Sequence, residues 1–247
     1  MSKTESNILL LSITLSWSAS YIFIKNLPAD FSPYAYLTMT TGIAAVLMIL
    51  LFRRKLLLLN RKVCIQAFYM AGLLTLNLLT EKWGIEFLPA SNASFLSSLS
   101  IIMVPLLLLI FRVKPTPNHI VGSIIILLGL CVTTSFKVQG FCNTGTVYML
   151  ASCLCSAVYT ILADYYTKED DPLLLSILQM VFTTVFGWVL WFLEEPATFG
   201  SVHYTRNLLS SIFILAFFSK AYAYIALMFA QKYTNAFQVT VIASTEP

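Results

Sequence analysis

The chain has 247 residues, of which 58% are hydrophobic and only 11% are charged, and its mean hydropathy is +0.82. A soluble domain carries roughly 25% charged residues, so this composition excludes an ordinary water-soluble fold and predicts an integral membrane protein. The net charge of +4 does not indicate a nucleic-acid partner, because the basic residues lie between apolar runs and form no continuous stripe.

Apolar segments recur along the chain, each close to the length of about 20 residues that a helix needs to cross a bilayer. Short connections join them, so no soluble domain interrupts the predicted bundle. A ninth apolar segment begins near Thr234 and is cut short at Pro247. The complete spans are predicted at residues 7–27, 34–52, 63–83, 91–111, 119–136, 144–165, 172–193 and 207–230.

The distribution of lysine and arginine predicts a cytoplasmic N-terminus, because cytoplasmic loops carry an excess of these residues. With this orientation, the loops after the second, fourth, sixth and eighth predicted spans lie inside the cell. The basic residues of these loops are Arg53, Arg54, Lys55, Arg61, Lys62, Arg112, Lys114, Lys168 and Lys232.

The two halves of the chain resemble each other at an offset of about 140 residues. WSASYIFIK and CSAVYTILA share Ser-Ala-x-Tyr, and NASFLSSLSIIMVP, from Asn92, corresponds to TNAFQVTVIASTEP, from Thr234. Five spans per copy is an odd number, so the second copy is expected to lie inverted in the membrane. The expected fold is an all-α integral membrane bundle of two inverted five-helix repeats, at residues 1–137 and 138–247, with the ninth helix truncated and the tenth missing.

Four stretches also carry a family resemblance: PASNASFLSSLSIIMVPLL, VGSIIILLGLCV, GTVYMLASCLCSAVYTILADYYTKEDDPLLLSILQM and YAYIALMFAQKYTNAFQVTVIASTEP. They resemble the fourth to ninth spans of the EamA-type transporters of the drug/metabolite transporter superfamily, bacterial branch. The resemblance implies a ten-helix, multi-pass transporter of small metabolites in the cell inner membrane. This chain departs from the family at Thr40, where an arginine is common, and at Lys220, where a small uncharged residue is usual.

Ionisable residues at membrane depth are the strongest candidates for function, because each is costly unless it is paired or hydrated. Lys220 lies about 13 residues into the eighth span and Glu246 about 12 residues into the ninth, so both fall in the middle third of the membrane at about 1.5 Å per residue. We expect them to face each other or a shared wet cavity. Glu246 is the predicted proton-coupling or cation-binding group, and Lys220 tunes it or meets an anionic group. The alternative is an ion pair that only locks two helices together.

A second charged cluster, Glu81, Lys82 and Glu86, lies toward the outer end of the third predicted span. Lys82 and Glu86 are four residues apart and share a helix face, whereas adjacent residues point apart. At that depth, we expect an interfacial anchor or an extracellular gate rather than a substrate ligand.

Amide, hydroxyl and aromatic side chains complete the predicted substrate site. Gln179 occupies the repeat position of Thr40, and Tyr159 that of Tyr21, so each pair is expected near the axis that relates the halves. A single ring in a bundle is more often packing than a ligand contact, but a group of rings around a charge suits an organic substrate. The predicted substrate-binding residues are Trp17, Tyr21, Thr40, Asn77, Asn92, Tyr159, Gln179, Lys220, Tyr222, Gln238 and Glu246.

The predicted function is secondary transport of a small organic metabolite, such as an amino acid or an amine, by alternating access with exchange or proton coupling. The expected partners are this small-molecule substrate and the lipid bilayer, without nucleic acid, metal or cofactor. An intramembrane enzyme is less favoured, because His119 and His203 lie in or beside loops, and no phosphate-binding loop indicates an ATP-driven pump. A truncated or non-transporting scaffold is the remaining alternative.

Overall fold

All regular structure in the described part of the chain is helical. The computed structural model describes residues 3–28, 31–110, 143–200 and 205–243, together with 120–122, 124–125 and 128. Within these residues, seven helices or runs of helices are long and apolar enough to cross a membrane. This confirms the prediction of an all-α, multi-span membrane bundle.

Each of these seven spans overlaps one of the predicted spans. They are Thr4–Lys25, Pro33–Leu58, Arg61–Phe87, Ala90–Leu109, Thr144–Glu169, Pro172–Glu194 and Arg206–Tyr233. The fifth predicted span, residues 119–136, falls mostly outside the described residues, as does the end of the ninth.

The helices of the two halves follow one another in the order that the apolar segments predict. The first half contains α1 (Lys3–Lys25), α2 (Pro33–Phe52), the 3-10 helix η1 (Arg53–Leu58), α3 (Arg61–Phe87), α4 (Ala90–Ser97) and α5 (Ser100–Ile110). The second half contains α7 (Thr144–Glu169), α8 (Pro172–Glu194), the 3-10 helix η2 (Pro196–Gly200), α9 (Arg206–Ile214), the π-helical segment η3 (Leu215–Tyr222), α10 (Ala223–Tyr233) and α11 (Ala236–Ala243).

The second helix of each half begins in the same way. A proline occupies the first helical position, where its missing N–H costs no hydrogen bond, and the side chain before it caps the helix. The Ser32 hydroxyl accepts hydrogen bonds from the backbone N–H groups of the first turn of α2. The Asp171 carboxylate does the same for the first turn of α8. Polar loops that end in proline therefore mark the start of these two spans.

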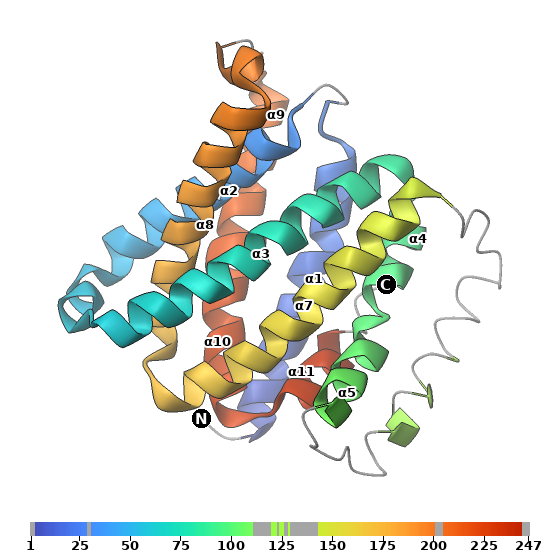
Figure 1. Ribbon diagram of the computed structural model, residues 1–247, viewed down its shortest axis with the longest axis vertical. Coiled ribbons are helices and arrows are strands. Elements are labelled where there is room, and N and C mark those ends of the chain that lie inside the picture. Colours follow the sequence, from blue (N-terminus) through green and yellow to red (C-terminus); the bar gives the residue numbers. More distant parts are fainter. Residues whose placement is uncertain are drawn as a thin grey trace.

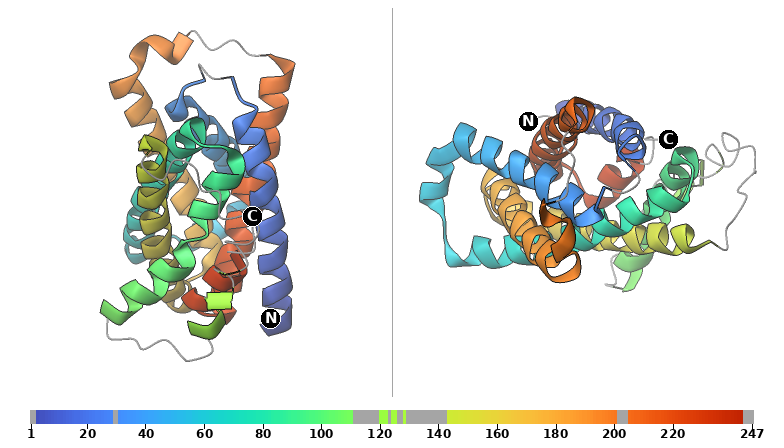
Figure 2. Two further views of the ribbon diagram at one scale, coloured as in Figure 1. Left: turned by 90° about the vertical axis from the view of Figure 1, so that its right-hand side faces the viewer. Right: turned by 90° about the horizontal axis from the view of Figure 1, so that it is seen from above.

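Helices α3 and α7 lie side by side across the front of the bundle, and α1 and α10 pass behind them (Figure 1). The other two views show the same grouping, with α1 beside α10 and at a distance from α7 (Figure 2). Between these groups, α2 packs along α8. Gly42 and Gly187 allow this close approach, since a Cβ on Gly187 would lie 2.7 Å from the Thr38 hydroxyl oxygen.

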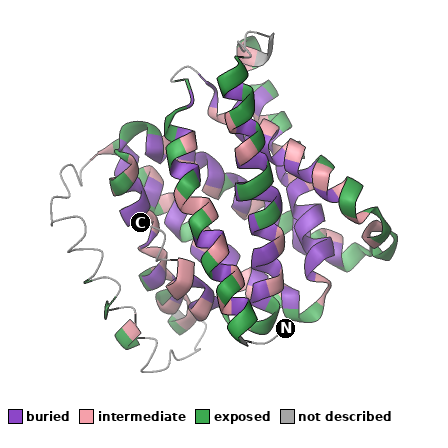
Figure 3. Cartoon of the chain, turned by 180° about the vertical axis from the view of Figure 1, so that it is seen from behind, coloured by how far each residue is buried: buried purple, intermediate pink, exposed green. Residues whose placement is uncertain are grey.

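Buried residues lie mainly on the inner faces of the helices, and exposed residues run along the outward faces (Figure 3). Many of these exposed residues are large and apolar, including Leu15, Ile22 and Leu50. In a membrane-spanning bundle, such residues meet lipid chains, so their exposure carries no hydrophobic cost.

Candidate functional site

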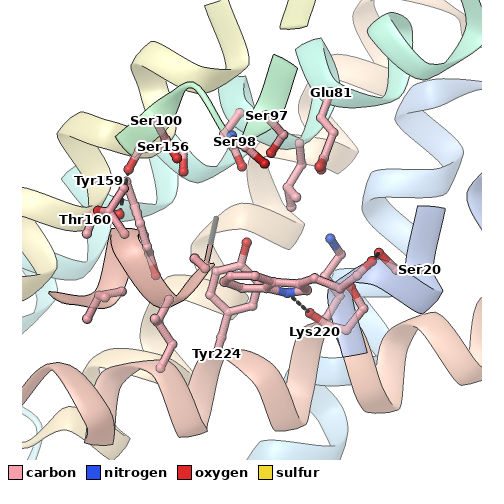
Figure 4. Close-up of a pocket in the computed structure, with 18 residues that line it drawn as sticks. Ser20, Glu81, Ser97, Ser98, Ser100, Ser156, Tyr159, Thr160, Lys220 and Tyr224 are labelled. Carbon is pink, nitrogen blue, oxygen red and sulfur yellow. Dashed lines mark hydrogen bonds between the residues drawn. The ribbon is translucent and has the colours of Figure 1, made fainter. Parts of the chain in front are cut away.

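A cavity of about 80 Å³ lies among the membrane-spanning helices (Figure 4). Helices α1, α3, α4, α5, α7, α10 and α11 and the segment η3 all contribute to its wall. Hydroxyl groups dominate the polar part of the lining. They come from Ser20, Ser97, Ser98, Ser100, Ser156, Tyr159, Thr160, Ser219, Tyr224 and Thr240.

Two opposite charges face this cavity. Glu81 from α3 and Lys220 from η3 both extend into the space between the helices (Figure 4). The Glu81 Oε1 accepts a hydrogen bond of 3.0 Å from the Tyr21 hydroxyl. Lys220 is only 3% exposed, and its Nζ lies 5.8 Å from the centre of the Tyr36 ring. An ammonium group at that distance from an aromatic face is stabilised by the ring electrons.

Two irregular helix segments form part of the cavity wall. The eighth span adopts a π-helical conformation over Leu215–Tyr222, which contains Lys220. Such wide turns are rare and occur frequently at functional sites. The fourth span is broken between α4 and α5 at Ser98 and Leu99, where the N–H groups of Leu99, Ile101 and Ile102 donate tighter hydrogen bonds to carbonyls three residues earlier. The cavity-lining serines of this span flank the break.

Aromatic rings form another side of the cavity. The Trp17 and Tyr224 rings lie 5.9 Å apart, and Tyr224 meets Tyr159 edge to face at 6.1 Å. The Trp17 indole N–H donates a 3.2 Å hydrogen bond to the Ser219 carbonyl, which fixes α1 against η3. Rings, hydroxyls and a pair of opposite charges together suit a small organic molecule with polar groups.

Four of the predicted substrate-binding residues line the cavity: Trp17, Asn77, Tyr159 and Lys220. A fifth, Tyr21, reaches it indirectly through its hydrogen bond to Glu81. The amide of Asn77 donates to the Ser152 carbonyl at 3.0 Å and to its hydroxyl at 2.9 Å, so it also joins α3 to α7.

Thr40 and Gln179, the repeat pair expected near the axis that relates the halves, form hydrogen bonds with other residues. The Thr40 hydroxyl donates to the Tyr36 carbonyl of its own helix, and Gln179 accepts a 2.9 Å hydrogen bond from the Tyr159 hydroxyl. A hydrogen bond between the Thr41 and Thr184 hydroxyls, 3.1 Å apart, joins α2 to α8. Both Thr40 and Gln179 are fully buried and do not line the described cavity.

The other predicted site residues in the described part of the chain do not line the cavity. Gln238 donates a 2.6 Å hydrogen bond to Asn7, and the Tyr222 hydroxyl is 2.6 Å from that of Ser12. Asn92 is partly exposed and does not line the described cavity. Glu246, the predicted partner of Lys220, lies outside the described residues. A role for these four residues in substrate binding stays a prediction.

The predicted charged cluster of the third span divides between two faces of α3. Lys82 is 4% exposed and donates a 2.6 Å hydrogen bond to Glu86, which confirms that these two share a helix face. Glu81 instead points into the cavity. Its position makes it a candidate substrate ligand, whereas the sequence favoured an anchor or a gate.

Most of the hydroxyl groups that line the cavity were not predicted from the sequence. A signal was present in SFLSSLS, where serines recur through an apolar span. Isolated serines are common in membrane helices and bond to their own backbone, as Ser98 does with the Ser94 carbonyl. Only the break between α4 and α5 gathers them at one cavity.

This fold and this charged cavity define a multi-span membrane protein of the transporter class. The model of the EamA-like transporter family matches residues 5–135 and again 143–247, and the chain belongs to this family. A curated relative, an uncharacterized transporter of Archaeoglobus fulgidus, is 22% identical over 95% of this chain and 72% of its own length. A crystal structure at 15% identity has the same fold, with a TM-score of 0.75 over 99% of this chain and 85% of that one.

Proposed function

We propose that this protein is a secondary transporter that carries a small polar metabolite across the plasma membrane by alternating access. The observation that supports this most is the pair of opposite charges, Glu81 and Lys220, that faces one cavity inside the membrane-spanning bundle. Ionisable residues are costly at that depth and mark substrate or ion pathways. Membership of the EamA-like family supports the same function.

The charges favour a zwitterionic substrate of the amino acid type. A zwitterion brings a carboxylate to Lys220 and an ammonium to Glu81, so the site gains no net charge when it is occupied. An ion of one sign would leave an unbalanced charge in a poorly hydrated site, which is costly. An amine or a carboxylate is carried at lower cost when Glu81 loses or gains a proton together with it. Both exchange and proton coupling are therefore compatible with this pair, and Glu246 remains a second candidate for the coupling group.

Alternating access requires one end of the bundle to be closed while the other opens. Ion pairs connect the two halves of the chain at one end: Lys55 with Asp171 at 2.6 Å, and Lys62 with Glu169 at 2.7 Å and with Asp170 at 3.1 Å. We propose that this end is cytoplasmic, as the lysine and arginine distribution predicts, and that these pairs separate when the transporter opens to the cytoplasm.

The test is flux of radiolabelled amino acids and amines into vesicles that contain the purified protein. The variants are Glu81→Gln, Lys220→Met and the double variant with both changes. Each single variant removes one of the two opposite charges that face the cavity, whereas the double variant removes both. We expect flux to fall by about tenfold or more in all three, because a charge-assisted contact to the substrate is worth roughly 1.5–3 kcal/mol.

The double variant separates a substrate site from a purely structural pair. If the charges only stabilise the fold, the neutral double variant recovers both its melting temperature and its flux. If they bind substrate, the double variant recovers stability but not flux. A protein that moves none of these compounds, and in which the charges affect only stability, would instead be the non-transporting scaffold.

A further inference from the structure

An apolar groove lies on the bilayer side of the same cavity, between α1 and η3. It has a volume of about 540 Å³, and its apolar lining is Leu15, Ala19, Phe23, Ile214, Leu215 and Phe218. Leu15 is 73% exposed and Phe218 is 52% exposed. Both helices belong to membrane spans, so the groove opens toward lipid.

The groove and the charged cavity meet at two small residues. Ser20 of α1 and Ser219 of η3 line both of them. Ser20 is bonded back to the Trp17 carbonyl of its own helix, so a small hydroxymethyl group from each helix separates the two spaces. One helical turn before Ser20, the buried Ser16 hydroxyl, also in the groove lining, has no hydrogen-bond partner among the described residues. A buried hydroxyl without a partner costs free energy, which a polar atom of a ligand at this junction would recover.

The two volumes define the shape of a ligand that would fill both. The cavity, at about 80 Å³, is below the range of roughly 300–1,000 Å³ that small-molecule sites occupy, whereas the groove, at about 540 Å³, falls inside it. The cavity is polar and carries both charges, and the groove is apolar. From Ser20 to Ser12 the groove follows α1 for about 12 Å at 1.5 Å per residue.

We propose that the substrate is an amphiphile, with a small zwitterionic head in the cavity between Glu81 and Lys220 and an apolar tail in the groove between α1 and η3. Such a molecule enters from the bilayer, and its head passes between Ser20 and Ser219. The zwitterionic head rests on the proposed function, whereas the tail site rests on the groove and the two shared serines.

The probe is N-octylglycine, whose head is zwitterionic, with a photoreactive diazirine at the end of its tail. Illumination of the wild-type protein in lipid nanodiscs is expected to label residues 12–23 and 214–222. Excess glycine, which has the same head without the tail, should reduce this labelling severalfold. Labelling that glycine leaves unchanged means that the groove holds ordinary lipid, and absence of labelling means that the tail does not enter it. Either result overturns the proposal.

A groove-filling variant provides the matched test. Ala19→Trp places a large ring in the groove, and we expect binding of N-octylglycine to weaken about tenfold, because the ring clashes with the tail. Ile22→Trp is the control, since Ile22 lies on the same helix, is 62% exposed and is not part of the groove lining. Equal weakening by both variants, or equal weakening of glycine binding, would contradict a tail site.

Flux distinguishes this inference from the proposed function. If glycine competes with the label but neither compound is transported, the amphiphile site stands and the transport function fails. If amino acids are transported but the tail labels nothing in the groove, the transport function stands and the amphiphile site fails.

Discussion

The helix pairs α3/α7 and α1/η3 come from corresponding parts of the two halves, but they pack differently. Helices α3 and α7 are in contact over their whole length. They are joined by Lys62 and Glu169 at one end, by Asn77 and Ser152 in the middle, and by Gly84 and Gly145 at the other end. Helix α1 and η3 are joined by the hydrogen bond from Trp17 to the Ser219 carbonyl and by the Ser12–Tyr222 pair, and a groove of about 540 Å³ remains between them.

Residue size at the contact accounts for much of this difference. A Cβ on Gly84 would lie 2.5 Å from the Met149 sulfur, and one on Gly145 would lie 2.7 Å from the Phe87 Cβ, so only glycine allows this approach. The groove between α1 and η3 is instead lined by large side chains, including Leu15, Phe23 and Phe218. Small residues let membrane helices approach closely, and large ones hold them apart. Two similar halves can thus give one closed and one open helix contact, which places the opening toward lipid on one side of the cavity.

The largest effect is expected from Gly145→Leu, which would force α3 and α7 apart. The new side chain meets Phe87 and Leu88 next to the α3 terminus, and overpacking of this kind costs about 1–3 kcal/mol. Melting temperature in detergent is the measurement. Gly72→Leu, on α3 with nothing within 4 Å of its Cβ position, is the control and should melt close to the wild type. Similar losses in both variants would show that the contact at Gly145 is not special.

A smaller loss of folding stability is expected from Asn77→Leu, because this change removes both hydrogen bonds to Ser152. Hydrogen bonds between membrane helices contribute about 0.6 kcal/mol on average, with a maximum near 1.7, so we expect a loss of about 1 kcal/mol. Tyr222→Phe is the matched change at the open contact. It removes one hydrogen bond at a side chain that is 37% exposed, and its effect should be smaller. If Tyr222→Phe lowered stability more than Asn77→Leu, the contact between α1 and η3 would be the stronger of the two.

The sequence predicts the spans well, because each apolar segment reports its own transfer free energy into the bilayer. The position of Lys220, about 13 residues into its apolar span, likewise predicts that this residue is buried. The position of Glu81 was harder to predict, because α3 extends to Phe87 and is longer than its most apolar part, residues 63–83. Glu81 therefore lies further from the helix end than the apolar segment alone implies. Contacts such as Gly84 with Gly145 depend on which helices meet, and composition does not contain that information.

The smallest effect on folding stability is expected from the ion pairs at the end of the bundle where α3 begins and α7 ends. Partial burial disfavours the charged form of Asp171, but hydrogen bonds from Lys55 and from the Leu174 backbone outweigh it and hold the pKa of Asp171 below its usual value. A carboxyl group with a lowered pKa stabilises the folded protein fully at pH values above its unfolded pKa of about 3.9. That contribution is lost as the pH falls through the lower pKa of the folded state.

Asp171→Asn tests this contribution, because asparagine can still cap α8 while the ion pair to Lys55 is lost. Ion pairs at exposed positions contribute about 0.2–1 kcal/mol, so the variant should melt slightly below the wild type at pH 7 and at pH 5. The difference should shrink as the pH falls below the unfolded pKa of about 3.9 and through the lower pKa of Asp171 in the folded protein. In a Lys55→Met background, Asp171→Asn should have less effect at pH 7, because the partner is already gone. A difference that is independent of pH and of Lys55 would mean that Asp171 acts through the helix cap alone, and that the two halves are held at this end by Lys62 with Glu169 and Asp170.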